Sequence, residues 1–164
     1  NINSWQKQRI SHLILQKLFN TLTGKKIAIF GFAFKADTND TRESSAISIC
    51  NDLLNEGAFL SIHDPKVEIS AIEDALNMKI SNLTSQSGAM QEGKWEKVDN
   101  YNEACKGADA IVILTEWSYY KNINWKSISK NMRKPAWVFD TRAIVKKEIV
   151  KQAGLKLWVI GNCN

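Results

Sequence analysis

Short apolar segments that alternate with helical stretches are the feature that most constrains the fold of this chain. Neighbouring antiparallel strands need only a tight turn, whereas parallel strands need a long crossover, usually a helix. The alternation therefore favours a parallel sheet covered by helices on both faces. The expected strands are Lys25–Phe30, Ala58–His63, a short Lys97–Val98, Ala110–Leu114, Trp137–Phe139 and Leu157–Ile160.

The expected helices complete an α/β fold: a three-layer, doubly wound, Rossmann-like domain whose mainly parallel sheet has five or six strands. A first helix over Ser4–Leu22, stopped by Gly24, precedes the sheet, and its apolar face with Trp5 is expected to pack outside this chain. The segment Asn77–Lys94 is expected to be a flexible insert. The remaining expected helices are Ser45–Asn55, Ile69–Leu76, Tyr101–Lys106, Trp125–Met132 and Lys146–Gln152.

Composition excludes several classes of function. Lys and Arg total 22 against 17 Asp and Glu, and the net charge of +5 is spread along the chain without a basic run, so nucleic acid is not indicated. The three cysteines have no CxxC spacing, which predicts neither a disulfide framework nor a zinc site and favours a cytoplasmic location. No apolar run approaches the roughly 20 residues of a membrane span, so no membrane partner is expected.

Doubly wound sheets bind ligands at the carboxyl ends of their strands, which selects the loops to inspect. The loop after the first strand reads FAFKADTNDTRES, and the loops after the third and fourth long strands are Thr115–Trp117 and Asp140–Arg142. Two of these loops carry an arginine, Arg42 and Arg142, near their ends. Anionic ligands are therefore the class to consider first.

The first loop departs from the dinucleotide-binding turn. Gly31 stands where the first glycine of GxGxxG would be, but Ala33 replaces the second, so the turn must be wider and the usual NAD-binding mode is disfavoured. A wider loop offers side chains instead. Phe34 could stack on a ring, Lys35 could meet a phosphate or a sugar hydroxyl, and Arg42 could bind phosphate oxygens.

Structural interpretations stay open beside these. The carboxylates of Asp37, Asp40 and Glu43 could form an internal ion-pair network, and Asp40 and Glu43 have the spacing of a helix capping box. Phe34 could belong to the core. Asp64 ends the second strand, where dinucleotide folds place a ribose-binding acid, but a turn-forming Asp-Pro is the preferred interpretation.

Four blocks in order, GKKIAIFGFAFKADTNDTRESSAI, HDPKV, ACKGADAIVILTEW and PAWVFDTR, resemble the C-terminal nucleotide-sugar-binding domain of UDP-glucose 6-dehydrogenases, in the UDP-glucose/GDP-mannose dehydrogenase family. The resemblance covers nearly the whole chain. It implies that residues 24–164 are the UDP-sugar-binding domain, and that residues 1–23 end a helical linker from upstream NAD-binding and central helical domains.

The resemblance also implies an activity. Enzymes of this family oxidise the C6 alcohol of UDP-glucose to a carboxylate, with NAD as the cofactor, and yield UDP-glucuronate. Their nucleophilic cysteine lies in an upstream glycine-rich segment, and none of Cys50, Cys105 and Cys163 falls in that motif. The resemblance therefore implies that this domain is inactive alone and that the full-length enzyme is a homo-oligomer.

Carried over by position, Phe34, Lys35 and Arg142 match residues that contact the UDP-sugar, and Arg42 matches the arginine that touches the NAD pyrophosphate. Thr141 departs from the glycine that relatives often carry before Arg142, which questions the backbone freedom there. A GDP-mannose or UDP-N-acetylhexosamine dehydrogenase is a second hypothesis, although Thr41 and Thr115–Trp117 favour UDP-glucose. A non-catalytic nucleotide-binding module and a stand-alone NAD-binding Rossmann domain also stay open as hypotheses.

Overall fold

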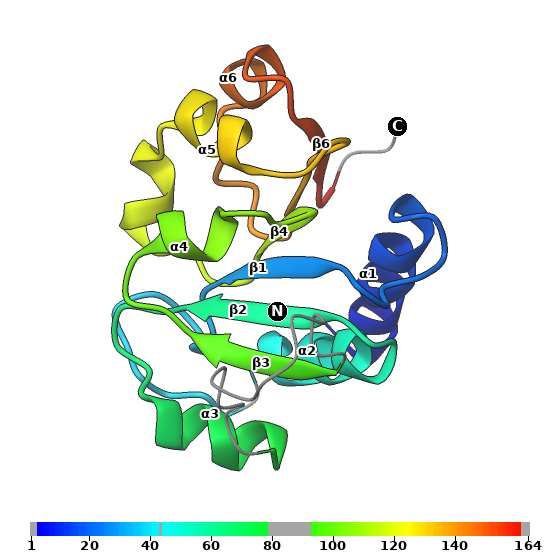
Figure 1. The fold of residues 1–164 in the computed structure, drawn as a ribbon. Coiled ribbons are helices and arrows are strands. Elements are labelled where there is room, and N and C mark those ends of the chain that lie inside the picture. The colour runs from blue at the N-terminus through cyan, green and yellow to red at the C-terminus, as the bar shows by residue number, and fades with distance from the viewer. Residues whose placement is uncertain (1–2, 43, 79–92, 162–164) are drawn as a thin grey trace.

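The computed structural model describes residues 3–42, 44–78 and 93–161, which form a single six-stranded sheet with the order β3-β2-β1-β4-β5-β6 (Figure 1). Every neighbouring pair of strands is parallel, so the predicted α/β class and parallel sheet are confirmed. The strands are β1 (Lys26–Phe30), β2 (Phe59–His63), β3 (Lys94–Lys97), β4 (Ala110–Ile113), β5 (Trp137–Asp140) and β6 (Lys156–Val159).

Helices cover both faces of this sheet and give the predicted three layers. α1, α2 and α3 pack in sequence on one face, and α4, α5 and α6 pack on the other (Figure 1). The bounds predicted for α2 and α3 are those observed. The helices are α1 (Ser4–Lys17), α2 (Ser45–Asn55), α3 (Ile69–Leu76), α4 (Tyr101–Cys105), α5 (Trp125–Asn131) and α6 (Lys147–Gln152), with a 3₁₀ turn at Ser118–Asn122 that the sequence analysis missed.

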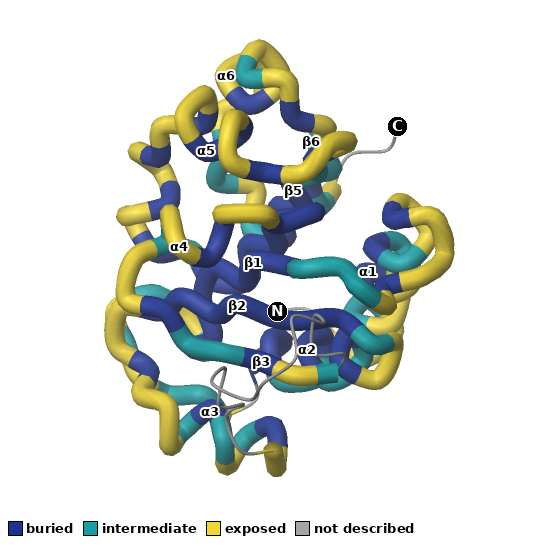
Figure 2. Tube along the Cα trace, viewed as in Figure 1, coloured by how far each residue is buried: buried dark blue, intermediate teal, exposed yellow. Residues whose placement is uncertain are grey.

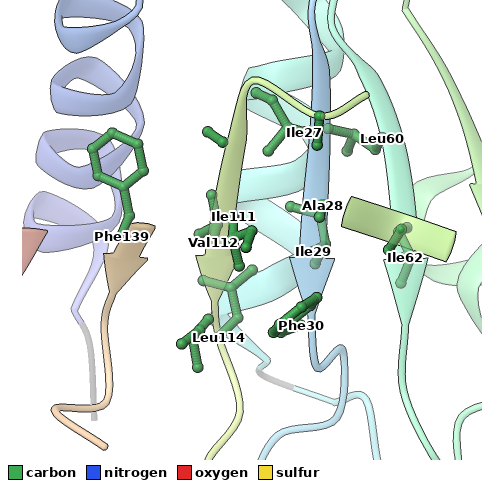
Figure 3. Packing of buried hydrophobic residues seen from close by; sticks show 14 of the residues in the cluster. Ile27, Ala28, Ile29, Phe30, Leu60, Ile62, Ile111, Val112, Leu114 and Phe139 are labelled. Atoms are coloured by element: carbon green, nitrogen blue, oxygen red, sulfur yellow. The ribbon is translucent and has the colours of Figure 1, made fainter. Parts of the chain in front are cut away.

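The central strands form the core. β1 and β4 are buried almost along their whole length, as Figure 2 shows by its dark blue centre. In Figure 3, Ile29 of β1 lies between Val112 of β4 and Ile62 of β2. Strands with apolar side chains on both faces can be stable only between two helical layers, which is why these segments read as continuous apolar runs.

The strand register brings the ligand-facing loops to one edge. Phe30 of β1 pairs with His63 of β2 and with Ile113 of β4, and Ile113 in turn pairs with Asp140 of β5. Each of these four residues is the last of its strand. The loops that follow β1, β2, β4 and β5 therefore begin side by side.

The first helix differs from its prediction in two ways. α1 ends at Lys17 rather than Leu22, because Phe19 and Asn20 adopt left-handed backbone conformations and the amide of Asn20 bonds back to the carbonyl of Leu15. Its apolar face packs on α2 rather than outside the chain, with Ile14 fully buried. Trp5, near the start of the helix, is 65% exposed.

Three sequence predictions lie wholly or partly outside the described residues. The insert predicted at Asn77–Lys94 falls mostly on residues 79–92, and Cys163 and Glu43 are likewise not described. The short strand predicted at Lys97–Val98 is observed three residues earlier, as β3, because Phe59–Ile62 of β2 pairs with Lys94–Lys97.

Gly31 allows the close approach of β1 and β4 at this edge. Its φ is +95°, and a Cβ there would lie 2.3 Å from Cβ of Thr115 and 2.8 Å from the Thr115 amide nitrogen. We expect Gly31→Ala to lower the free energy of unfolding by about 3 kcal/mol or more, because the strained φ and the backbone clash add. Urea denaturation measures the loss.

Gly107→Ala is the matched control, since Gly107 also has a positive φ, +71°, but has open space around its missing Cβ. This variant should lose only about 1 kcal/mol. Equal losses in the two variants would contradict the steric argument.

Candidate functional site

Asp64 organises the carboxyl edge of the sheet from within. It is only 2% exposed, and its Oδ2 accepts hydrogen bonds from the backbone amides of Phe32 (2.8 Å) and Ala33 (3.0 Å) and from Nε1 of Trp117 (3.2 Å). Its Oδ1 accepts from the amides of Lys66 (2.9 Å) and Val67 (3.0 Å). Both oxygens are therefore saturated, so the turn-forming interpretation is confirmed and a ribose-binding role for this acid is wrong.

This arrangement explains how the turn after β1 manages without its second and third glycines. In a dinucleotide-binding turn, backbone amides at this place meet a pyrophosphate. Here the amides of Phe32 and Ala33 already bond to a carboxylate of the same chain. These two amides are therefore not available to a pyrophosphate.

The remainder of the first loop closes on itself. The amide of Phe34 donates to the carbonyl of Asp40 (2.7 Å), and Nε and Nη2 of Arg42 grip the two carboxylate oxygens of Asp40 at 3.1 and 3.0 Å. This guanidinium lowers the pKa of Asp40. The capping-box prediction for Asp40 is wrong, because α2 begins at Ser45 and its N-cap is Ser44, whose hydroxyl accepts the amide of Ala46.

Phe34 and Lys35 lie at the rim of this loop. Phe34 is half-buried, and the fully buried aromatic of the loop is Phe32, so the core interpretation of Phe34 is wrong. Lys35 is exposed, and within 3–42, 44–78 and 93–161 no hydrogen bond or ion pair engages its ammonium group. Phe34 is thus partly and Lys35 largely accessible to solvent at this rim.

Arg142 ties three loops together. Its Nε donates to the carbonyl of Leu114 after β4 (3.0 Å), and its Nη2 donates to the carbonyl of Phe34 after β1 (3.3 Å). The carboxylate of Glu116 lies 3.3 Å from Nε and also accepts the amide of Ala36 at 3.3 Å. The structure therefore brings Phe34, Lys35 and Arg142 to one place, whereas Arg42 extends from the loop and is 89% exposed along its side chain.

The loop after β5 is held from two sides. Asp140 is fully buried, and its carboxylate accepts the amides of Arg142 (3.0 Å), Ile144 (2.8 Å) and Val145 (2.9 Å). Thr141 donates its hydroxyl to the carbonyl of Ile113 at 2.6 Å. The positive φ of this loop lies at Ala143, at +56°, and not at Thr141, so the backbone freedom questioned there is not needed at that position.

Sequence reasoning missed the roles of Glu116 and Asp140. Both are ordinary acids in the sequence, and only the pairing of β4 with β5 shows which amides and cations their carboxylates reach. The available signal was position, since Asp140 ends β5 and Glu116 lies in the loop after β4, both at the ligand-binding edge.

An aromatic cluster lies beneath this edge. His63 is buried, its Nδ1 lies 2.9 Å from the hydroxyl of Tyr120, and the same hydroxyl donates to the carbonyl of His63 at 3.1 Å. Phe30 stacks on Tyr120 with ring centroids 4.9 Å apart. His63 is thus packed in the interior rather than on the surface. Burial lowers its pKa below the usual 6.5, and nearby Lys97 acts in the same direction.

This lowered pKa predicts how the stability of the fold depends on pH. Below pH 6.5 His63 binds a proton in the unfolded chain, whereas in the folded chain it stays neutral to a lower pH. The contribution of His63 to the free energy of unfolding is therefore complete above the pKa of the unfolded state, and it is lost as the pH falls through the pKa of the folded state. We expect His63→Gln to reduce the loss of unfolding free energy between about pH 7 and pH 5.5, measured by urea titration. His12→Gln, on the exposed surface of α1, is the control; an unchanged pH dependence in His63→Gln would contradict the prediction.

Other chemistries find no support in the described part of the chain. No cluster of three or more His, Cys, Asp or Glu side chains could hold a metal there, and none of the described helices is long and apolar enough to cross a membrane. Cys50 and Cys105 are buried, and burial raises the pKa of Cys105 to about 12 and that of Cys50 further. Neither thiol is available as a nucleophile.

Two surface pockets lie away from the loop edge. One, of about 300 Å³, lies between α1 and α2 beside His12, and the other, of about 440 Å³, lies between α5 and α6 beside Trp125. Neither contains a residue of the loops that meet at Arg142.

The sequence of this chain is similar to those of known proteins. The profile of the UDP-glucose/GDP-mannose dehydrogenase family, UDP binding domain, matches residues 28–147. The UDP-glucose 6-dehydrogenase of Caenorhabditis elegans is 43% identical over 163 residues, which are 98% of this chain and 32% of that protein. The UDP-glucose 6-dehydrogenase of Drosophila melanogaster is 42% identical over 161 residues, which are 98% of this chain and 33% of that protein.

A solved structure shares the fold. The UDP-D-ManNAc dehydrogenase of Pyrococcus horikoshii aligns with a TM-score of 0.71 and 27% identity, over 97% of this chain and 31% of that one. The chain thus spans about a third of the length of the relatives that it matches.

Proposed function

The chain belongs to the UDP-glucose/GDP-mannose dehydrogenase family, and from that premise we propose that it is the UDP-sugar-binding domain of a UDP-glucose 6-dehydrogenase. The whole enzyme would oxidise the C6 alcohol of UDP-glucose to a carboxylate and release UDP-glucuronate. The identity of 43% and 42% to two relatives with this name supports UDP-glucose as the sugar. Upstream NAD-binding and central helical domains would supply the remaining two thirds, with residues 1–23 as the end of the linker.

The observation that carries the proposal is the junction at Arg142. Its Nε and Nη2 donate to carbonyls of two other loops, and no described residue accepts a hydrogen bond from Nη1. A guanidinium fixed in this way can meet a phosphate or sugar oxygen without first losing rotational freedom. Phe34 and Lys35 would complete the substrate contacts, by ring packing and by a second positive charge.

NAD would bind to the upstream domain and would only contact this chain. The amides of the turn after β1 are occupied by Asp64, so the sheet edge itself does not match a dinucleotide site. Arg42 is exposed along its side chain but pairs with Asp40 through Nε and Nη2, and its guanidinium would exchange this carboxylate for the pyrophosphate of NAD held by the upstream domain. Bound NAD would supply the hydride acceptor.

The domain's own contribution would be binding and orientation. Cations that fix the UDP moiety would place C6 against reactive groups of the upstream domains, which turns binding energy into correct geometry. The buried thiols of Cys50 and Cys105 offer no substitute for an upstream cysteine. We therefore propose that the domain alone is inactive, and that the full-length enzyme is a cytoplasmic homo-oligomer.

NADH formation by the full-length enzyme tests this function. We would supply UDP-glucose, UDP-N-acetylmannosamine and GDP-mannose in separate assays. Two NADH per UDP-glucose and little from the other sugars are expected. Turnover with another sugar alone would keep the family and move the substrate, whereas no turnover with any of them would favour a non-catalytic nucleotide-binding module.

A further inference from the structure

The buried carboxylate of Asp140 has no role in the function proposed so far. It ends β5 with no exposed surface, and it accepts three backbone amides, those of Arg142, Ile144 and Val145. A charged group is costly to bury unless donors surround it, and here every donor comes from the loop that carries Arg142. The carboxylate therefore fixes the path of that loop.

The loop it holds is strained. Ala143 lies between the bonded residues Arg142 and Ile144 and adopts a φ of +56°, a conformation that residues with a Cβ avoid. On its other side, the hydroxyl of Thr141 holds the carbonyl of Ile113. Strain of this kind persists only when surrounding contacts enforce it, and the amide bonds to Asp140 are those contacts.

The strained path has a consequence for the arginine. It turns the chain so that the side chain of Arg142 runs back across β4, to the carbonyls of Leu114 and Phe34. We propose that Asp140 is a positioning residue that holds Arg142 in place for the UDP-sugar; this inference rests on the substrate role proposed above for Arg142. Asp140 touches no ligand itself, because it is fully buried.

Calorimetric titration of the full-length enzyme with UDP tests the inference, using Asp140→Asn, Arg142→Ala and the double variant. Asp140→Asn should weaken UDP binding about tenfold, the scale of one misplaced charge-assisted hydrogen bond. The same change should add little in the Arg142→Ala background, because the arginine through which Asp140 acts is gone. Glycine adopts a positive φ freely, so Ala143→Gly should restore part of the affinity lost in Asp140→Asn.

Two further variants guard against a general loss of structure. Asp109→Asn removes another buried carboxylate that accepts a backbone amide, that of Lys26, but at the opposite edge of the sheet; it should lower stability and leave UDP affinity unchanged. If Asp140→Asn does not fold, Ala143→Val strains the same loop from an exposed position and should weaken UDP binding.

The outcomes separate the two proposals. Normal UDP affinity in Arg142→Ala would overturn the substrate role of Arg142. Weak binding by Arg142→Ala with normal binding by Asp140→Asn, or by Ala143→Val in its place, would overturn the positioning role alone. An equal loss from Asp140→Asn with and without Arg142 would also overturn it, since it would show that the carboxylate supports the site by another route.

Discussion

Arg142→Ala is expected to lower kcat/KM for UDP-glucose in the full-length enzyme by about 30-fold to 1000-fold, the equivalent of about 2 to 4 kcal/mol for a lost charge-assisted contact with a partly buried phosphate or sugar oxygen. The structure adds a second reason. The guanidinium bonds to the carbonyls of Leu114 and Phe34, so its loss also frees the loops that shape the site.

Two variants make this result specific. Arg142→Lys keeps the charge but lacks the fork that reaches two carbonyls at once, so its loss should be smaller than that of alanine but clear. Arg133→Ala removes an arginine that pairs with Asp109 at the opposite edge of the sheet, at 3.6 Å, and should leave kcat/KM unchanged. Near-normal kinetics for Arg142→Ala would contradict the assigned role.

Asp64→Ala should have the largest effect on stability. Five donors, the amides of Phe32, Ala33, Lys66 and Val67 and the indole of Trp117, lose their acceptor together inside the protein. We expect the free energy of unfolding to fall by about 3 to 5 kcal/mol, the usual cost of leaving buried partners of a charged group unsatisfied. Urea denaturation of this chain provides the measurement.

Asp109→Asn is again the comparison, because Asp109 is buried but accepts a single backbone amide, from Lys26, and its ion-pair partner Arg133 is largely exposed. Its loss should be about 1 to 2 kcal/mol. An Asp64→Ala variant no less stable than Asp109→Asn would show that water replaces the carboxylate, and would remove Asp64 as the organiser of this edge.

Much of the fold could be predicted because its signals are local. Apolar runs marked β1, β2 and β4, and helical periodicity placed α2 and α3 at their observed bounds. The end of α1 could not be predicted, because Phe19 and Asn20 take left-handed conformations that the sequence does not require. β3 was misplaced because an edge strand with polar residues takes its register from β2.

The residues of the site could likewise be predicted only in part. Phe34, Lys35 and Arg142 could be selected because they follow strands at the edge where ligands bind. The hydrogen-bond partners of Asp40 and Asp140 could not be predicted, because a carboxylate in a loop has many donors within reach. The sequence suggests Asp40 as a helix cap, whereas the structure uses Ser44 for the cap and gives Asp40 to Arg42.

The packing of α1 determines where a recombinant form of this domain can begin. Ile10, Ile14, Leu18 and Leu22 are buried in the same core as the sheet and α2, so a version that starts at the first strand would expose a wide apolar face on α2. Such a surface invites self-association in solution. A soluble recombinant domain would therefore have to retain the first helix, however naturally that helix reads as part of the preceding linker.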